Sequence, residues 1–335
     1  MSREKVLSFL RSGETVSGEE LSRALGLSRT AVWKAVQSLR REGYVIEARP
    51  GLGYHLTRIP DALTEREIRN FLGPVRTVGR AVVCFDEIDS TNNYAKKLGN
   101  EGGQSGTVVI ANCQTAGRGR VNRTFQSPRD KGIYLSVMLR PHLPTKRLLP
   151  ATALAGVAVC DAVERVCGVR PRLKWPNDPV LGGRKLCGIL TEASLEGESG
   201  SVPMLVVGIG LNVSQAPEDF TPDVAKIATS LAQELDRPVS RPQLAAAMIE
   251  ALDRACSALL DQRIGPYLDT FRRDCVNLGC EVQLIHQGKA EVVTALDIDD
   301  QFHLLVRDAA GQERTVWSGE VSVRGLDGYT DGDGI

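Results

Sequence analysis

The amino-acid sequence predicts a multidomain α/β (α+β) protein, in which a winged helix-turn-helix is followed by a central domain with a mixed sheet and a small C-terminal β-barrel. Three observations lead to this expectation. At 335 residues, the chain exceeds what one hydrophobic core usually serves, so two or three domains are expected. The first segment carries helix and turn signals, and the middle mixes extended and helical runs. The end holds only short extended runs separated by turn residues.

The N-terminal segment carries the signals of three short helices. Apolar residues recur at helical spacing in the first, at Val6, Leu7 and Leu10. Ser17 with Glu20 forms a capping-box pattern before the second helix, which Gly26 ends, and Ser28 can cap the third. Two helices separated by a glycine-containing turn are typical of a helix-turn-helix. The extended runs 45–48 and 53–56 then predict a hairpin wing.

The remaining elements define the predicted domain boundaries. A connecting helix is expected from Thr64 to Leu72. In the central domain we expect strands at 81–85, 107–112, 133–139, 172–175, 186–191 and 204–213, and helices at 93–98, 148–166 and 241–260. Short strands are expected at 281–285, 290–296, 302–307, 313–317 and 321–323. The predicted domains are 1–60, 61–277 and 278–326, followed by a disordered tail at 327–335 that is rich in Gly and Asp.

Charge and apolar patterning limit the partners of the chain. Basic and acidic residues balance at 41 each, so no global field favours nucleic acid or a membrane. Up to Arg58, ten Lys or Arg stand against six acids, which makes that end modestly basic. No apolar run of about 18 residues occurs, and the N-terminus lacks a signal-peptide pattern. We therefore expect a cytoplasmic protein without membrane partners. Any DNA binding must depend on a local basic surface and not on the net charge of the chain.

The eight cysteines show no CxxC pair and lie mostly among apolar neighbours. This pattern is typical of reduced cytosolic thiols. We expect neither disulfides nor a zinc site.

A loop after the strand expected at 107–112 is rich in glycine and arginine, running from Gln114 to Arg120 as Gln-Thr-Ala-Gly-Arg-Gly-Arg. Glycines let backbone N–H groups approach an anion, and closely spaced arginines supply forked donors for carboxylate or phosphate oxygens. Such a loop fits a bound adenylate. A solvated basic loop is the alternative that this segment alone leaves open.

Two further segments place polar side chains at the ends of expected elements. Ser90, Thr91 and Asn92 precede a helix expected from Asn93, where they can cap the helix and also contact the polar ring of a ligand. Capping alone is the simpler interpretation. Downstream, the sequence Lys-Trp-Pro-Asn-Asp ends at Asp178, whose carboxylate could orient a cation or hold Mg²⁺ near phosphates.

Lys185 opens the strand that follows this bend. A lysine is a mobile point charge, suited to neutralising the charge that develops on a phosphoryl or carboxylate oxygen in a transition state. Taken alone, the position favours an exposed lysine at a strand edge over a functional one.

Taken together, these segments resemble the biotin protein ligases. The motifs Ser-Thr-Asn, Gln-x-x-Gly-Arg-Gly-Arg, Lys-Trp-Pro-Asn-Asp, Arg-Lys-x-x-Gly-Ile-Leu and Gly-x-Gly-x-Asn occur here in that order, the last at 208–212. Five ordered matches are specific where each alone is weak. The front and the end of the chain match the branch whose members also repress the biotin operon. The resemblance implies a central domain of the biotin/lipoate ligase type and an SH3-like C-terminal barrel.

The resemblance also implies roles for individual residues. Biotin contacts are implied for Ser90, Thr91, Asn92, Gln114, Arg118, Gly119, Arg120 and Lys185. Nucleotide contacts are implied for Arg118, Arg120, Asn177, Asp178, Asn212 and Arg324. The implied catalytic residues are Lys185, Arg118 and Arg120, and Asp178 is the implied ligand of Mg²⁺. Glu320 and Arg324 fit a Glu-x-x-x-Arg pattern that, by resemblance, faces the nucleotide and the acceptor.

The chain departs from the family pattern at two positions of the arginine loop. Asn122 stands where the family usually has Gly, and Phe125 stands where it usually has Trp. Asn tolerates a left-handed backbone better than most residues, so the loop can keep its path. Phe125 keeps an aromatic ring but lacks the indole donor. Both changes bear on how well an adenylate is retained.

The implied reaction has two steps. The biotin carboxylate attacks the α-phosphate of ATP to give biotinyl-5′-AMP, and a lysine of a biotin carboxyl carrier protein then attacks this mixed anhydride. No covalent enzyme intermediate is required, so we expect positioning and charge neutralisation by Mg²⁺, Arg118, Arg120 and Lys185. Two alternatives stay open: a ligase for another carboxylate such as lipoate, and a biotin-sensing repressor without catalysis.

The second helix of a helix-turn-helix enters the major groove, which predicts the residues that face DNA. They are Ser28, Arg29, Thr30, Trp33 and Lys34, together with Arg49 from the wing. A buried Trp33 is the alternative without a role in DNA binding. Because the basic excess is small, we expect weak binding by a monomer and useful affinity for operator DNA from a homodimer. The resemblance implies that biotinyl-5′-AMP favours that dimer.

Overall fold

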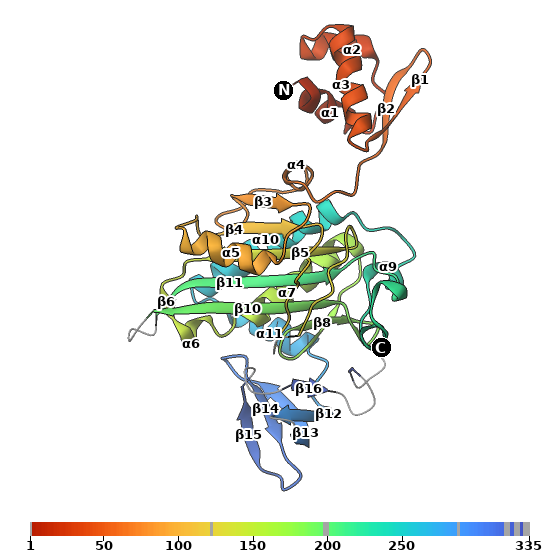
Figure 1. The fold of residues 1–335 in the computed structure, drawn as a ribbon. Coiled ribbons are helices and arrows are strands. Elements are labelled where there is room, and N and C mark those ends of the chain that lie inside the picture. Colours follow the sequence, from red (N-terminus) through yellow and green to blue (C-terminus); the bar gives the residue numbers. More distant parts are fainter. Residues whose placement is uncertain are drawn as a thin grey trace. The chain divides into compact units, whose positions relative to one another are not determined.

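The computed structural model describes residues 2–120, 123–196, 201–286, 289–317, 322–324 and 329–330. The chain divides into two compact units, Met1–Asp61 and Ala62–Ile335 (Figure 1). Each unit encloses hydrophobic clusters made only of its own residues.

The first unit has three helices followed by a hairpin, as predicted. Its elements are α1 (Ser2–Leu10), α2 (Gly18–Leu25), α3 (Arg29–Arg41), β1 (Val45–Arg49) and β2 (Gly53–Arg58). The Ser17 and Ser28 hydroxyls accept hydrogen bonds from backbone N–H groups of α2 and α3, which satisfies donors that a helix start leaves unpaired. Gly26 ends α2 at φ 63°, a left-handed conformation. The two strands pair antiparallel and form the wing.

The larger unit is built on a mixed sheet. Its strands are, in spatial order, β10 (Cys187–Glu196), β11 (Ser201–Asn212), β5 (Gly132–Leu139), β4 (Thr107–Ala111) and β3 (Val82–Phe85), with β6 (Leu143–Pro144) paired to β11. β3 and β4 are parallel, and the other pairs are antiparallel. The predicted mixed sheet is confirmed.

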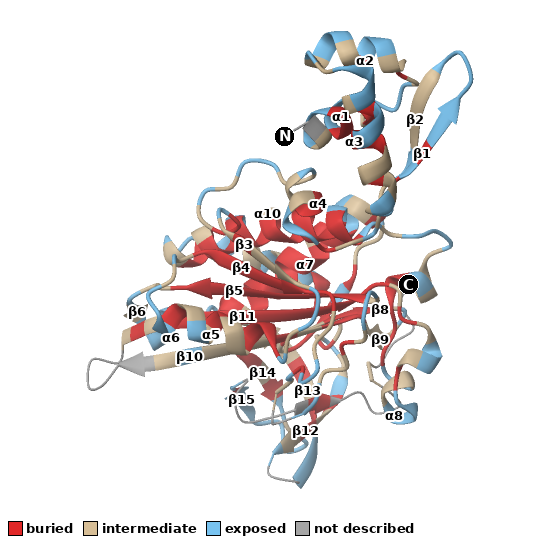
Figure 2. Cartoon of the chain, turned by 45° about the horizontal axis from the view of Figure 1, so that its top comes forward, coloured by how far each residue is buried: buried red, intermediate tan, exposed pale blue. Residues whose placement is uncertain are grey.

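Helices cover both faces of this sheet (Figure 1). In β4, Val108 and Ile110 join the core that includes α7 (Ala151–Cys167) and α10 (Arg241–Leu260). Val109, between them, packs with residues of α5 (Thr91–Asn100). Successive side chains of a strand point to opposite faces, so coverage of both faces explains why consecutive positions are apolar. Figure 2 shows the resulting buried layer of strands.

Smaller elements surround the sheet. They are α4 (Glu65–Arg69), α6 (Thr145–Leu148), η2 (Pro217–Asp219), α8 (Pro222–Ala225), α9 (Leu231–Glu234), α11 (Gly265–Asp274) and the antiparallel sheet of β7 (Arg172–Lys174), β8 (Asp178–Leu181) and β9 (Arg184–Lys185). The connecting helix α4 is shorter than predicted, although Thr64 caps it as the sequence indicates. The helix α5 begins at Thr91, two residues before the predicted start.

A loop before β3 is fixed to α10 by one carboxylate. Asp253 lies on α10 with 5% of its surface exposed. Its oxygens accept hydrogen bonds from the backbone N–H groups of Arg76, Thr77 and Val78 at 2.7, 2.9 and 2.8 Å. A single side chain therefore supplies the acceptors for three consecutive peptide groups.

The C-terminal part forms a five-stranded antiparallel sheet, which confirms the predicted small β domain. Its strands are, in spatial order, β15 (Glu313–Val316), β14 (Leu304–Arg307), β13 (Lys289–Ile298), β12 (Glu281–His286) and β16 (Ser322–Arg324). Trp175, which follows β7, donates its indole N–H to the carbonyl oxygen of Phe302 at 3.0 Å. Phe302 also packs edge-on against Phe271 of α11 at 5.6 Å. These contacts join the C-terminal sheet to the rest of the larger unit.

Some predicted features lie partly or wholly outside the described residues. Asn122 and Glu320 are among them, and so is most of the tail predicted to be disordered. Tyr329 and Thr330 are the tail residues that the structure describes. All eight cysteines are free thiols. Within the described ranges, no helix has the length and apolar character needed to cross a bilayer.

Candidate active site

A cavity of about 740 Å³ lies in the larger unit. Its lining includes residues from all five sequence motifs: Ser90, Thr91, Asn92, Gln114, Arg118, Gly119, Arg120, Asn177, Asp178, Lys185 and Asn212. These are the predicted catalytic, biotin-binding and nucleotide-binding residues except Arg324, whose side chain lies outside the described part of the chain. Segments that lie far apart in the sequence therefore meet around one cavity.

The start of α5 and the arginine loop are joined at one end of the cavity. The Gln114 Oε1 atom accepts hydrogen bonds from the Thr91 N–H at 2.9 Å and from the Thr91 hydroxyl at 3.1 Å. The Gln114 amide group in turn donates to the Ser127 hydroxyl at 2.9 Å. Ser90 is the N-cap of α5. The predicted N-cap of α5 is therefore confirmed. Ser90, Thr91 and Gln114 also line the cavity.

Asn92 is held by two buried or half-buried polar residues that the sequence analysis did not single out. The Ser136 hydroxyl lies 2.6 Å from Asn92 Oδ1, and Asn92 Nδ2 donates to Glu192 at 2.9 Å. Gly208 faces this amide, because a Cβ atom there would lie only 2.0 Å from Asn92 Oδ1. Burial favours a raised pKa for Glu192, but hydrogen bonds from Asn92 and Lys96 outweigh it and lower the pKa. The Glu192 carboxylate thus stays charged beside the cavity.

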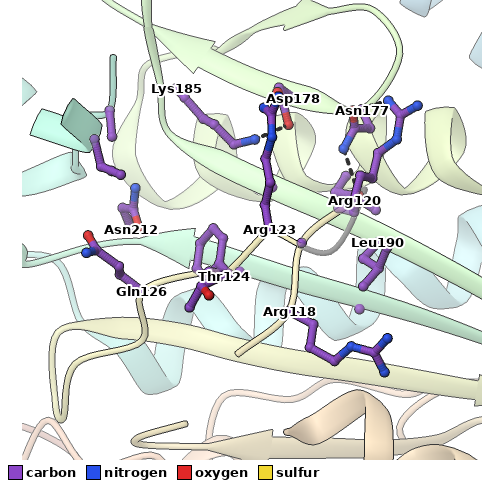
Figure 3. A pocket seen from close by; sticks show the side chains of 18 of the residues that line it. Arg118, Arg120, Arg123, Thr124, Gln126, Asn177, Asp178, Lys185, Leu190 and Asn212 are labelled. Atoms are coloured by element: carbon purple, nitrogen blue, oxygen red, sulfur yellow. Dashed lines mark hydrogen bonds and ion pairs between the residues drawn. The ribbon is translucent and has the colours of Figure 1, made fainter. Parts of the chain in front are cut away.

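The three arginines of the loop diverge. Arg120 donates to Asn177 Oδ1 at 3.2 Å, and burial lowers the pKa of its guanidinium. Arg118 donates to Asn93 at 3.4 Å and lies 3.7 Å from Glu192. Figure 3 shows the Arg118 side chain turned away from the pair formed by Lys185 and Asp178. Arg123, to which the sequence analysis gave no role, also lines the cavity. Positive charge is therefore spread along the cavity and not gathered at one point.

Lys185 and Asp178 form an ion pair on the neighbouring strands β9 and β8. The Lys185 Nζ atom donates to Asp178 Oδ1 at 2.6 Å, and 13% of the Asp178 side chain is exposed (Figure 3). Burial favours a raised pKa for Asp178, but the charge and hydrogen bond of Lys185, the Tyr329 hydroxyl and the charge of Lys174 together lower it. The Lys185 backbone is fixed as well, because its N–H donates to the Ile227 carbonyl at 2.7 Å. The lysine is held facing the cavity in a preset orientation.

Phe125 lines the cavity at the position where the family usually has tryptophan. A Cβ atom at Gly210 would lie 2.4 Å from the Phe125 ring, and one at Gly188 would lie 3.2 Å from it. Gly210 and Gly188, which come from two different motifs, thus leave room for the Phe125 ring above the sheet. Asn212, the last residue of that motif, donates to the Thr229 carbonyl and accepts from Gln215. Its predicted contact with the nucleotide stays a prediction.

In the first unit, α3 and the wing line a hollow of about 580 Å³. Arg29, Thr30 and Trp33 border it from α3, and 53% of the Trp33 surface is exposed, which excludes the alternative of a buried tryptophan. The other predicted DNA-facing residues, Ser28, Lys34 and Arg49, are also exposed. Arg29 pairs with Glu19 at 2.6 Å, so its charge is partly compensated in the free protein.

Similarity to known proteins extends over nearly the whole chain. The model of the biotin/lipoate A/B protein ligase family matches residues 84–212, and a model of an HTH domain matches residues 2–55. The bifunctional ligase/repressor BirA of Bacillus subtilis is 34% identical over 316 residues, which cover 94% of this chain and 96% of the relative. The protein of the same description from Escherichia coli K12 is 32% identical over 321 residues, covering 96% of each chain.

A solved structure agrees with the fold of the larger unit. The biotin protein ligase from Aquifex aeolicus, in complex with biotin and ATP, has a TM-score of 0.63 and 25% identity. The match covers 73% of this chain and 99% of that one. The chain therefore belongs to the biotin/lipoate protein ligase family, in the group of bifunctional ligase/repressors that carry an N-terminal helix-turn-helix.

Proposed function

We propose that the chain activates biotin with ATP to form biotinyl-5′-AMP, transfers the biotin to a lysine of a biotin carboxyl carrier protein, and represses the biotin operon in its adenylate-bound state. The observation that carries this proposal is the meeting of five motif segments around one cavity of about 740 Å³, a size typical of small-molecule sites. The relatives with both printed activities match nearly the full chain. We place this activity in the cytoplasm, where the chain would meet operator DNA and the carrier protein.

The first step joins biotin to AMP. A carboxylate oxygen of biotin forms a bond with the α-phosphorus of ATP, the bond from that phosphorus to the bridging oxygen breaks, and pyrophosphate leaves. The carboxylate and the phosphates repel each other, so the site must neutralise charge before they can meet. Lys185, Arg118 and Arg120 are the cavity cations that we assign to this task, and no side chain acts as a nucleophile.

The second step transfers the acyl group. The uncharged amine of a carrier-protein lysine attacks the biotin carbonyl carbon, an amide bond forms, and the bond from that carbon to the AMP oxygen breaks. The amine nitrogen loses a proton and AMP leaves with the electron pair. Because the acyl phosphate is already activated, the protein only has to position the incoming lysine.

The residues present fit Mg²⁺ that arrives with the phosphates of ATP. Among the described residues, no group of three or more His, Cys, Asp or Glu is placed to hold a metal ion. Mg²⁺ in nucleotide sites usually has one or two carboxylate ligands, with phosphate and water oxygens as the others. We assign Asp178 as that carboxylate because it lines the cavity beside Lys185. When bound, Mg²⁺ would withdraw charge from the phosphate oxygens.

The polar end of the cavity favours biotin over lipoate. The Thr91, Asn92 and Gln114 side chains bring hydroxyl and amide groups to the start of α5. The ureido ring of biotin offers N–H donors and a carbonyl acceptor that can pair with such groups. The dithiolane ring of lipoate offers neither, and a polar site strongly rejects an analogue that leaves its groups unpaired.

Pyrophosphate exchange into ATP tests the proposed activity directly. With Mg²⁺ present, we expect exchange to depend on added biotin, with lipoate giving no more than the rate without any acid. Equal exchange with lipoate would assign the chain to the lipoate branch. Tight binding of biotin without exchange would favour a repressor that only senses biotin.

We further propose that a homodimer binds operator DNA through α3 and the wing of each copy. The exposed Trp33 and the neighbouring hollow support this interface. A module with a small basic excess gains few phosphate contacts, so two copies spanning two half-sites supply the affinity that one copy lacks. The biotinyl-5′-AMP formed in the larger unit serves as the corepressor that favours the dimer.

A Trp33→Ala variant is expected to bind biotin-operon promoter DNA about tenfold more weakly, because an exposed ring on the recognition helix contributes to base or backbone contacts. Fluorescence anisotropy with labelled promoter DNA, in the presence of biotin and ATP, measures the affinity. Trp317→Ala is the matched control, since Trp317, which directly follows β15, is also 53% exposed. Equal affinities of the two variants would remove Trp33 from the DNA interface.

A further inference from the structure

A tyrosine from the C-terminal tail reaches the Lys185–Asp178 pair. The Tyr329 hydroxyl donates to Oδ2 of Asp178, from a position 151 residues later in the chain. The Tyr329 ring also lies under Lys174, whose Nζ atom is 3.5 Å from the ring centroid. Tyr329 is itself part of the cavity lining. The proposed active site therefore includes a tail residue that no motif contains.

The contact is supported at the neighbouring residue. The Thr330 hydroxyl donates to the carbonyl oxygen of Gly183 at 2.9 Å. Gly183 precedes β9, Asp178 begins β8 and Lys174 ends β7. Tyr329 and Thr330 thus contact three positions of the small sheet formed by β7, β8 and β9 and the turn within it. Lys185 lies on the last of these strands.

Tyr329 and Lys185 together fix the orientation of the Asp178 carboxylate. One oxygen of the carboxylate accepts from Lys185 at 2.6 Å, and the other accepts from Tyr329. A carboxylate held at both oxygens cannot rotate without losing one of these bonds. Because hydrogen bonds to a charged group are among the stronger ones, the phenol fixes the carboxylate and, through it, the Lys185 ammonium.

The Lys174 contact adds a second constraint. Lys174 is 4% exposed, so its charge is held within the protein. A cation above the face of an aromatic ring is stabilised most when it is shielded from water. The ring of Tyr329 thus keeps the Lys174 charge in place beside Asp178.

We propose that Tyr329 is a positioning residue of the adenylation step: its hydroxyl orients Asp178 so that Lys185 stays aimed at the phosphates, and its ring forms the wall of the cavity beside Lys174. The proposal rests on the proposed function, since it assigns a task within the reaction of biotin with ATP. Tyr329 acts as a wall and not as a plug, because about 740 Å³ of space remains beside it.

Two tyrosine variants separate the hydroxyl from the ring. Tyr329→Phe is expected to lower kcat of biotin-dependent pyrophosphate exchange about tenfold, with KM for ATP little changed, because only the bond to a charged carboxylate is lost. Tyr329→Ala is expected to raise KM for ATP about fivefold as well, because the ring and its contact with Lys174 are also lost. Tyr267→Phe on α11, outside the described lining of the cavity, is the matched control.

The split between kcat and KM provides a readout that a purely structural role would not move. A general loss of folded protein would lower the apparent kcat of Tyr329→Phe and Tyr329→Ala alike and leave KM for ATP unchanged in both. Loss of the hydroxyl alone should lower kcat only, whereas loss of the ring should also raise KM for ATP.

Faster exchange in either Tyr329 variant would overturn the proposal, because it would make the tail an obstacle to ATP. Wild-type kcat and wild-type KM for ATP in both variants would also overturn it. Binding of a non-hydrolysable ATP analogue with Mg²⁺, measured by calorimetry without biotin, separates this result from a failure of the proposed function. If the wild type binds the analogue but shows no biotin-dependent exchange, the function fails. In that case, weaker binding of the analogue by Tyr329→Ala would still support the role of Tyr329, and unchanged binding would contradict it.

Discussion

Lys185→Ala is expected to lower kcat for biotin-dependent pyrophosphate exchange about 100- to 1000-fold, the range seen when one preorganised charge-stabilising group is removed. The Lys185 ammonium is preset by Asp178 at 2.6 Å and by the backbone bond of β9 to Ile227. It can therefore neutralise charge on the reacting oxygens without first being reorganised. The measurement is exchange at saturating biotin and ATP, together with equilibrium binding of biotin.

The control for this variant addresses charge and folding. Lys97→Ala on α5 removes a lysine whose side chain is 68% exposed, and it should leave exchange unchanged. Removal of Lys185 also breaks the ion pair of the largely buried Asp178 carboxylate, and breaking a buried ion pair is costly. Thermal unfolding by circular dichroism must therefore show that the variant is folded. A folded Lys185→Ala protein with wild-type kcat would dismiss the assigned site.

Asp253→Ala is expected to lower the free energy of unfolding of the larger unit by about 3–5 kcal/mol, because three backbone N–H groups lose their acceptor in an enclosed position. The three bonds are 2.7, 2.9 and 2.8 Å long, and the carboxylate is 5% exposed. For a unit of this size, such a loss corresponds to a fall in Tm of about 10 °C. Thermal and denaturant unfolding, followed by circular dichroism, measure it.

A graded series makes the cause of this loss testable. Asp253→Asn keeps the oxygen that serves Thr77 and Val78 but places either an N–H₂ group or a rotated amide against the Arg76 N–H. Its destabilisation should fall between that of the alanine variant and the wild type. Asp269→Ala, at an exposed aspartate of α11, is the control for charge and should have little effect. Equal stability of Asp253→Ala and Asp269→Ala would contradict the anchoring role of Asp253.

Local signals account for what the sequence predicted well. The caps at Ser17, Ser28 and Thr64 depend on residues three positions apart, and the structure forms all three bonds. The strands of the sheet were visible as apolar runs because both faces are covered. Only the resemblance predicted that the motif residues share one site. No local sequence signal predicts, for example, that the Thr91 N–H lies 2.9 Å from Gln114 Oε1.

What the sequence did not predict depends on contacts across the fold. Ser136 is one polar residue in an apolar strand, and only its approach to Asn92 at 2.6 Å gives it a role. The helix α11 begins with Gly265 and a proline, a pair that ordinarily marks a turn, although proline also suits the first turn of a helix. Tyr329 is a lone aromatic residue in a tail of glycine and aspartate, a composition typical of disorder. Its binding partners lie about 150 residues upstream.

The indole of Trp175 ties the C-terminal sheet to a segment that lines the cavity. The residue belongs to the motif that ends at Asp178, yet its N–H is satisfied by the carbonyl of Phe302. Shortening the chain before β12 would remove that acceptor and uncover Phe271. We therefore expect a shortened chain to need its last sheet in order to fold, whereas Met1–Asp61 encloses a core made only of its own residues.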